Sequence, residues 1–157
     1  MFLNKARSGW VLWELLLALS ICGILATLSI GSLRTWLVDT TLQSLRYRVV
    51  ALLDTAREAA YSMHEPMVLC ASRTGRTCEG SWTAGQLVQS LSGHGIVTAL
   101  GHLPVGYTLR YAGSFGHNAV LNVLPDGNLE GPGSFYVCAL TKCVRIVVLT
   151  SGRTRVE

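Results

Sequence analysis

The feature that most constrains this chain is an apolar run of twenty-four residues near its N-terminus, Trp10–Leu33. As an α-helix this run would be roughly 36 Å long, enough to cross the hydrocarbon core of a bilayer. Lys5 and Arg7 precede it without acidic residues, which favours a cytoplasmic N-terminus. A secretory signal peptide fits less well, because its apolar core is shorter, about 7–15 residues, and ends in a cleavage site of small residues. The sequence therefore predicts a single membrane-spanning helix.

Glu14 is the only charged residue in this run. A carboxylate in lipid is costly, so an acidic residue at this depth is expected to have a partner, such as an amine from another chain. The alternative is an uncleaved single-pass anchor that tolerates the acid.

The residues around Glu14 resemble the class III signal of type IV pilins and pseudopilins. The pattern is a basic leader, Gly9, a bulky apolar residue at Trp10, and the glutamate five places after the glycine. The resemblance implies that a prepilin peptidase cleaves between Gly9 and Trp10 and methylates the new N-terminus on Trp10. It also implies that Glu14 neutralises the terminal amine of a neighbouring pilin or pseudopilin during assembly.

The periodicity predicts that the helix continues from about Trp10 to Met63, roughly 80 Å in length. Pro66 with Glu65 is expected to end it. Apolar residues recur every three or four positions along it and form a stripe that would cover a sheet: Leu33, Leu37, Leu45, Val49, Leu52, Ala56 and Ala60. We therefore expect a leader at 1–9, a transmembrane half of the helix at 10–33, an amphipathic half at 34–65 and a β-rich head at 66–157.

Short segments rich in β-branched and aromatic residues follow Pro66 and predict an antiparallel head. They are Met67–Ala71, Gln86–Gln89, Tyr107–Ala112, Ala119–Leu124, Phe135–Leu140 and Cys143–Thr150. Pro125–Asn128 is expected to form a turn, Ala139–Lys142 a four-residue hairpin loop, and the polar stretch 90–101 a mobile loop. The expected fold class is α+β, with the long N-terminal helix packed on an antiparallel sheet, as in type IV pilins.

Four of the five cysteines fall in the head, and the fifth, Cys22, is expected to be buried in the apolar helix. Cys138 and Cys143 flank the expected hairpin loop, so they would face each other across two strands at a separation that suits a disulfide. Cys70 and Cys78 would then close a second loop, although four cysteines allow three connectivities. A zinc site is the competing interpretation, but the spacing is unlike that of Cys-x-x-Cys motifs.

Residues of the head narrow the resemblance to the GspH/FimT group. They are the segments Cys70–Cys78, Trp82–Gly85, Leu124–Gly127, Phe135–Cys138 and Ser151–Arg155. In this group, GspH-type members are minor pseudopilins of type II secretion, and FimT-type members are minor type IV pilins linked to DNA uptake in natural transformation. The closing Gly152-Arg-Thr-Arg155 is similar to the DNA-binding tail of the FimT type.

An extended tail would place Arg153 and Arg155 on one side, about 6.6–7 Å apart, close to two nucleotide rises along one strand of B-form DNA. Two guanidinium groups could then contact neighbouring phosphates without reading sequence. Lys142 and Arg145 would extend this surface, as would Arg73 and Arg76 if the disulfide loop lies nearby. The alternative is a pair of solvated arginines, because the net charge from residue 35 onward is only +2, ten Lys or Arg less eight Asp or Glu.

The sequence offers little support for an enzyme, a cofactor or a metal. Its four histidines have no metal-like spacing: His64, His94, His102 and His117. Asp126 could be drawn with Ser114 and His117 as a catalytic triad, but it belongs to the expected turn. The favoured hypothesis is a minor type IV pilin in the inner membrane, with a periplasmic head that binds DNA. A GspH-type pseudopilin that binds partner pseudopilins and a pilus-priming minor pilin without a DNA ligand remain the alternatives.

Overall fold

The computed structural model describes residues 8–93, 95–113, 120–140 and 142–157, without the side chains of residues 8–11, 26–30 and 32. The chain divides into two units, residues 1–40 and residues 41–157, and each is described by itself. The helix α1 (Ser8–Met63) contributes to both units. The expected helix from about Trp10 to Met63 is therefore confirmed.

The first unit exposes large apolar side chains on every side of α1, Leu12, Trp13, Ile21 and Trp36 among them. Glu14 is also exposed. Cys22 is a free, exposed cysteine. The expectation that Cys22 is buried was wrong for the single chain, since a lone helix supplies no second layer to cover it. Within the described residues, no helix is both long and apolar enough to cross a membrane.

In the second unit, one face of α1 is buried. Its buried residues are Leu42, Leu45, Val49, Leu52, Leu53, Ala56, Ala59 and Ala60, which include the predicted stripe from Leu45 onward. Leu33 and Leu37, also assigned to that stripe, belong to the first unit and are exposed. The helix ends at Met63, and His64 adopts a left-handed φ of 54° before Pro66. A left-handed residue directly after the last helical turn is a common way to stop a helix.

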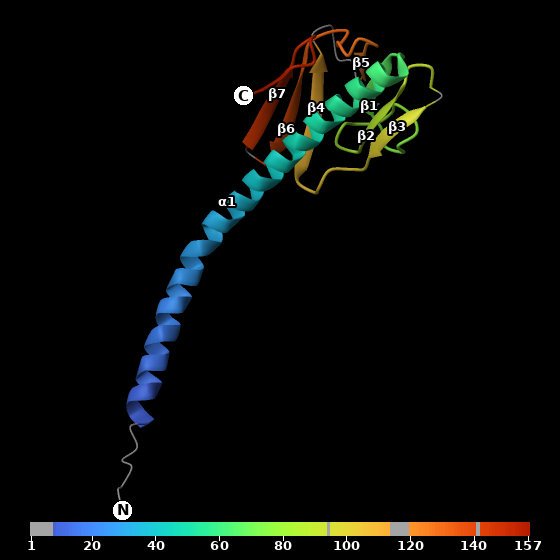
Figure 1. The fold of residues 1–157 in the computed structure, drawn as a ribbon. Coiled ribbons are helices and arrows are strands. Elements are labelled where there is room, and N and C mark those ends of the chain that lie inside the picture. Colours follow the sequence, from blue (N-terminus) through green and yellow to red (C-terminus); the bar gives the residue numbers. More distant parts are fainter. Residues whose placement is uncertain (1–7, 94, 114–119, 141) are drawn as a thin grey trace, which may run out of the picture. The chain divides into compact units, whose positions relative to one another are not determined.

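In the described residues of the second unit, eight strands form two four-stranded antiparallel sheets (Figure 1). The first sheet has the order β3-β2-β1-β5, with β1 (Met67–Ala71), β2 (Gln86–Ser90), β3 (Ile96–Leu100) and β5 (Val120–Val123). The second has the order β4-β6-β7-β8, with β4 (Tyr107–Gly113), β6 (Gly133–Ala139), β7 (Lys142–Val148) and β8 (Thr154–Val156). The α+β fold with a long helix on antiparallel sheets is thus confirmed.

Two local predictions were wrong. Ile96–Leu100, within the stretch expected to be a mobile loop, is the edge strand β3 and pairs with β2. The strand itself is apolar, Ile96-Val-Thr-Ala-Leu100, but it is short and lies between polar and glycine-rich residues that are typical of a loop. The β6–β7 connection has two residues rather than four, since Ala139 pairs with Lys142. Leu140 takes a φ of 50° there, as a tight hairpin turn requires.

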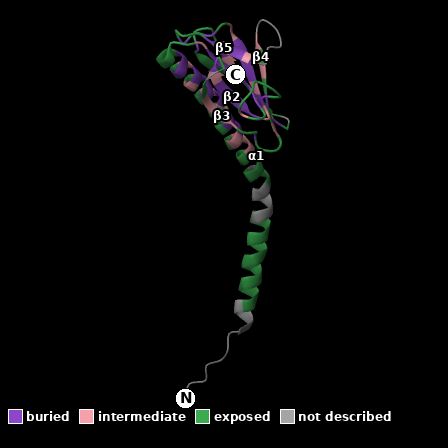
Figure 2. Ribbon diagram, turned by 90° about the vertical axis from the view of Figure 1, so that its right-hand side faces the viewer, coloured by how far each residue is buried: buried purple, intermediate pink, exposed green. Residues whose placement is uncertain are grey.

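The core lies between the sheets and the adjoining face of α1, where Figure 2 shows the buried residues. Alternation along the second sheet directs Leu109, Phe135 and Ile146 inward. Trp82, from the loop between β1 and β2, packs edge-on against Phe135, with ring centroids 5.2 Å apart. Tyr111 completes this aromatic cluster, and its ring lies 4.7 Å from that of Phe135. One face of the second sheet is therefore committed to the core, and its other face remains available to solvent.

Candidate nucleic-acid interface

The C-terminal segment is an edge strand rather than a loose tail. Val147 pairs with Arg155, and Val148 pairs with Thr154. The backbone N–H of Leu149 donates to the carbonyl of Arg153 at 3.0 Å, and Gly152 donates to the carbonyl of Leu149 at 2.8 Å. This is a three-residue hairpin loop that ends in a left-handed glycine, and Gly152 has the φ of 76° that such a loop needs.

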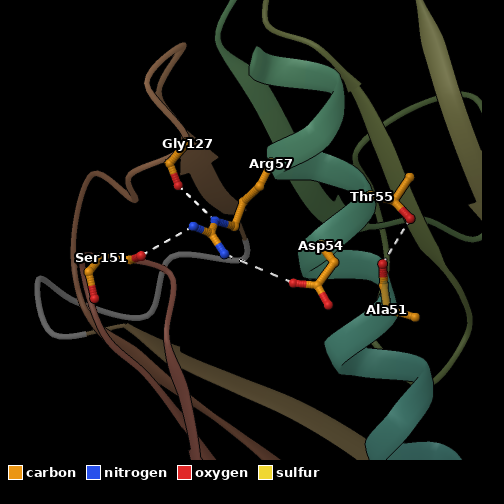
Figure 3. Close-up of polar contacts among 6 residues, drawn as sticks. All are labelled: Ala51, Asp54, Thr55, Arg57, Gly127 and Ser151. Carbon is orange, nitrogen blue, oxygen red and sulfur yellow. Dashed lines mark hydrogen bonds and ion pairs between the residues drawn. The ribbon is translucent and has the colours of Figure 1, made fainter. Parts of the chain in front are cut away.

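Arg57 of α1 donates hydrogen bonds both to this hairpin loop and to the turn that contains Gly127 (Figure 3). Its Nε donates to the carbonyl of Gly127 at 2.9 Å, and its Nη2 donates to the carbonyl of Ser151 at 3.3 Å. Nη1 also lies 4.0 Å from a carboxylate oxygen of Asp54, one turn earlier on the helix. The start of β8 is thereby fixed to α1.

Among the described residues, four arginines lie on the outer face of the second sheet. Arg145 on β7 exchanges two backbone hydrogen bonds with Glu157, which follows β8. On its other side Arg145 lies opposite Tyr136 of β6, and Tyr136 lies opposite Arg110 of β4. Because side chains two residues apart share a face, Arg153 and Arg155 lie on the same side of the sheet as Glu157 and Arg145. All four arginines are exposed. Arg155 is therefore extended in the edge strand β8, and Arg153 directly precedes that strand and is joined to Leu149 by a backbone hydrogen bond, whereas Gly152 turns the chain.

Glu157 forms ion pairs with two of these arginines. Its carboxylate lies 3.3 Å from Nη1 of Arg145 and 3.8 Å from Nε of Arg155. The Arg155 side chain remains 79% exposed, whereas those of Arg145 and Glu157 are each 46% exposed. Ion pairs this open to water are weak, worth about 0–1 kcal/mol, so a phosphate could replace the carboxylate.

Arg145 also contacts two uncharged groups of the same face. Its Nε donates to the hydroxyl of Ser134 at 3.3 Å, and its guanidinium carbon lies 5.9 Å from the ring centre of Tyr136. Tyr136 and Arg110 were not predicted from the sequence. The alternation along β4 and β6 indicates which face each of the two side chains occupies. It does not show that they are neighbours, because that follows only from the register that pairs Arg110 with Tyr136.

The other predicted DNA-binding residues lie elsewhere. Gly152 is buried against Arg57 and turns the chain, so it presents no surface to a ligand. Lys142 begins β7 with the opposite alternation from Arg145, which places it on the other side of the sheet. Arg73 and Arg76 are exposed in the loop after β1, a strand of the other sheet. The structure therefore brings together Arg145, Arg153 and Arg155 but not the remainder.

Both predicted disulfides are present. Cys70 is bonded to Cys78, with Cα atoms 5.5 Å apart, and Cys138 is bonded to Cys143, with Cα atoms 4.1 Å apart. The backbone N–H and C=O of Arg145 bond to Glu157, just after β8, so Arg145 forms a non-hydrogen-bonded pair with Tyr136 on β6. The same kind of pair recurs two residues earlier, where Cys143 lies opposite Cys138. This is the closer of the two kinds of antiparallel pair, as expected for a cross-strand bridge.

Only some of the residues considered for other roles lie in the described part of the structure. Asp126 lies in its predicted turn, where the backbone N–H and then the side-chain amide of Asn128 lower the pKa of its carboxyl. His94, Ser114 and His117 lie outside the described residues, as does the expected leader up to residue 7. Gly9 and Trp10 fall in the first turn of α1, without described side chains. Among the described residues, no group of three or more His, Cys, Asp or Glu could hold a metal.

The fold defined by this helix and these sheets is that of type IV pilins. The chain is similar to the type IV minor pilin FimU of Pseudomonas aeruginosa in two crystal forms. The first match has a TM-score of 0.61 at 20% identity and covers 76% of this chain and 90% of FimU. The second has a TM-score of 0.59 at 18% identity and covers 74% of this chain and 92% of FimU.

It is also similar to the minor pseudopilin EpsH from the type II secretion system of Vibrio cholerae. That match has a TM-score of 0.56 at 13% identity and covers 76% of this chain and 97% of EpsH. At these identities the likeness concerns the fold. No protein-family model and no curated protein matches the chain.

Proposed function

We propose that this protein is a minor type IV pilin that assembles with other pilins and binds DNA without sequence specificity on the outer face of its second sheet. The observation that carries the proposal is the set of four exposed arginines on that face, Arg110, Arg145, Arg153 and Arg155. Opposed by Glu157, they give the face a net charge of about +3. The likeness to a minor pilin and a minor pseudopilin supports an assembly subunit rather than an enzyme.

Assembly would depend on the first unit. We propose that residues 1–9 are a leader removed by prepilin peptidase, with Trp10 as the methylated first residue, and that residues 10–33 anchor the protein in the inner membrane. Glu14, on a helix whose apolar side chains are exposed, would neutralise the terminal amine of a neighbouring subunit. The sheets would then stand in the periplasm, the compartment in which disulfides form and persist.

DNA binding would rest on phosphate contacts. Arg153, directly before the edge strand β8, and Arg155 within it can take nearby phosphates of one DNA strand, because alternate residues are about 6.6–7 Å apart, on the scale of two nucleotide rises. Arg145 lies one strand further in and would join them when a phosphate replaces Glu157. Contacts of this kind position DNA without reading its bases, so binding should be sequence-independent and should weaken steeply with salt.

The test is duplex DNA binding by the full chain in detergent, across a salt series. We compare Arg153→Ala/Arg155→Ala with the control Arg73→Ala/Arg76→Ala, which removes two exposed arginines from the other sheet's loop. The tail variant should bind more weakly, with a salt slope lower by about 2, because each phosphate contact contributes about 0.9. The control should bind as wild type does. Equal binding by both double variants and the wild type, or no binding by any of them, would refute the DNA-binding role.

A GspH-type minor pseudopilin of type II secretion is the second candidate, and the likeness to EpsH favours it. In that case the second unit would contact partner pseudopilins. A minor pilin that primes assembly and has no DNA ligand is a further alternative. All three share the assembly role of Glu14, so Glu14→Ala should be cleaved normally and enter filaments poorly. Normal filament entry by this variant would contradict the charge-neutralisation role.

A further inference from the structure

The outer face of the second sheet contains a hollow of about 290 Å³ beside Tyr136 and Arg145. Ala112, Gly113, Gly133 and Ser134 also line it. Because these four residues are small, the sheet surface is depressed here, whereas the tyrosine and the arginine stand beside the depression. This volume lies just below the range for small-molecule sites, about 300–1,000 Å³, so it suits one ring system rather than a long ligand.

The groups around this hollow match the parts of a single nucleotide. Tyr136 offers an aromatic ring, and Ser134 beside it is buried, with its hydroxyl accepting a hydrogen bond from Arg145. Arg145 lines the hollow, and Arg155 stands opposite Val147, which lines it as well. Both guanidinium groups approach the carboxylate of Glu157, at 3.3 Å and 3.8 Å, so they lie near each other, and both are exposed enough to take a phosphate from solvent. A planar aromatic group beside two cations on a sheet face is the combination by which proteins hold unstacked bases.

We propose that this hollow is a subsite for one unstacked base of single-stranded DNA, with the phosphate of that nucleotide on Arg145 and Arg155 and the base against Tyr136. The inference rests on the proposed DNA-binding function and specifies its ligand. In a duplex the faces of the bases are stacked on one another, so a tyrosine on a sheet can reach one only after the base is unpaired at a cost. The protein should accordingly prefer single strands.

The experiment compares two ligands on the full chain in detergent: an oligothymidylate of about twelve nucleotides and an abasic strand of equal length and charge. Stacking on one base typically contributes enough to change affinity about 5- to 100-fold. The wild type should therefore bind the oligothymidylate at least about 5-fold more tightly than the abasic strand. Tyr136→Ala should abolish that difference, whereas Tyr136→Phe, which retains the ring, should preserve it.

Tyr47→Ala is the matched control, because Tyr47 is an exposed tyrosine on α1, and it should leave the difference unchanged. Equal affinity of the wild type for the two ligands would overturn the subsite, and so would an unaltered preference in Tyr136→Ala. In both cases binding to the shared phosphate backbone would persist and the proposed DNA-binding function would survive. Failure of the wild type to bind any strand, single or duplex, would instead remove the DNA-binding function itself.

Discussion

The guanidinium of Arg57 occupies the space that a side chain on Gly152 would need. A Cβ atom built on Gly152 would lie 2.5 Å from Cζ of Arg57 and 2.9 Å from its Cδ. These two residues connect the helix to the loop before β8, so the position of the arginine-bearing edge strand depends on a contact between residues that are far apart in the sequence.

Gly152→Ala should destabilise the protein for two reasons, its φ of 76° and the collision with Arg57. Gly93→Ala is the matched control, because Gly93 has a φ of 75° and nothing within 4 Å of a built Cβ. The control should cost about 1–2 kcal/mol from the left-handed backbone alone. Gly152→Ala should cost at least about 1 kcal/mol more, measured by urea unfolding. Equal losses of stability in the two variants would show that the Arg57 side chain moves aside at no cost in free energy.

Arg57→Met should weaken both loops that accept hydrogen bonds from its guanidinium. Removing donors to the carbonyls of Gly127 and Ser151 should lower the free energy of unfolding by about 1–3 kcal/mol. Arg57→Lys keeps the charge but cannot span both carbonyls, so its loss should be intermediate. Amide hydrogen exchange should report the opening of both loops. Exchange that accelerates in only one of them would contradict the double attachment.

Thiol counting tests the disulfide assignment. The chain has five cysteines, and four are bonded as Cys70–Cys78 and Cys138–Cys143. The denatured, unreduced protein should therefore show one reactive thiol, from Cys22, and five after reduction. Four reactive thiols in Cys22→Ser before reduction would disprove both bridges.

Tyr111 should make stability depend on alkaline pH. Burial raises the pKa of its phenol above the ordinary 10.0, so the unfolded state releases this proton at lower pH than the folded state does. The contribution to stability is complete below pH 10 and is lost as the pH rises through the folded pKa. Tyr111→Phe should accordingly lose less stability than the wild type between about pH 9 and 11. Parallel losses in urea unfolding at the two pH values would exclude this role for Tyr111.

Glu157→Gln should strengthen DNA binding, because the carboxylate competes with phosphate for Arg145 and Arg155. Exposed ion pairs are weak, so the gain should be about 2- to 5-fold. Glu58→Gln removes an exposed acid from α1 and is the matched control, expected to change affinity little. A fluorescence titration at fixed salt measures both. Unchanged affinity in Glu157→Gln would indicate that phosphates do not bind where the carboxylate lies.

Patterns that repeat over a few residues were readable from the sequence. The helix to Met63, its stripe from Leu45 onward and most strands have periodicities that local chemistry imposes. The Cys138–Cys143 bridge was also predictable, because a hairpin brings its flanking residues together whatever the remainder of the chain does. β3 was missed because its five residues, although apolar, lie between polar and glycine-rich flanks that are typical of a loop.

The sequence by itself determined a long helix, an antiparallel head and an arginine pair at the end of the chain. Only the tertiary structure decided which residues share a surface with that pair. Arg110 and Tyr136 join Arg145 through strand pairing across many intervening residues, whereas Lys142 does not, because it lies three residues before Arg145 on β7 and therefore on the opposite face. The physical reason is that alternation assigns a side chain to one of two faces, and only register and packing decide which face meets the core.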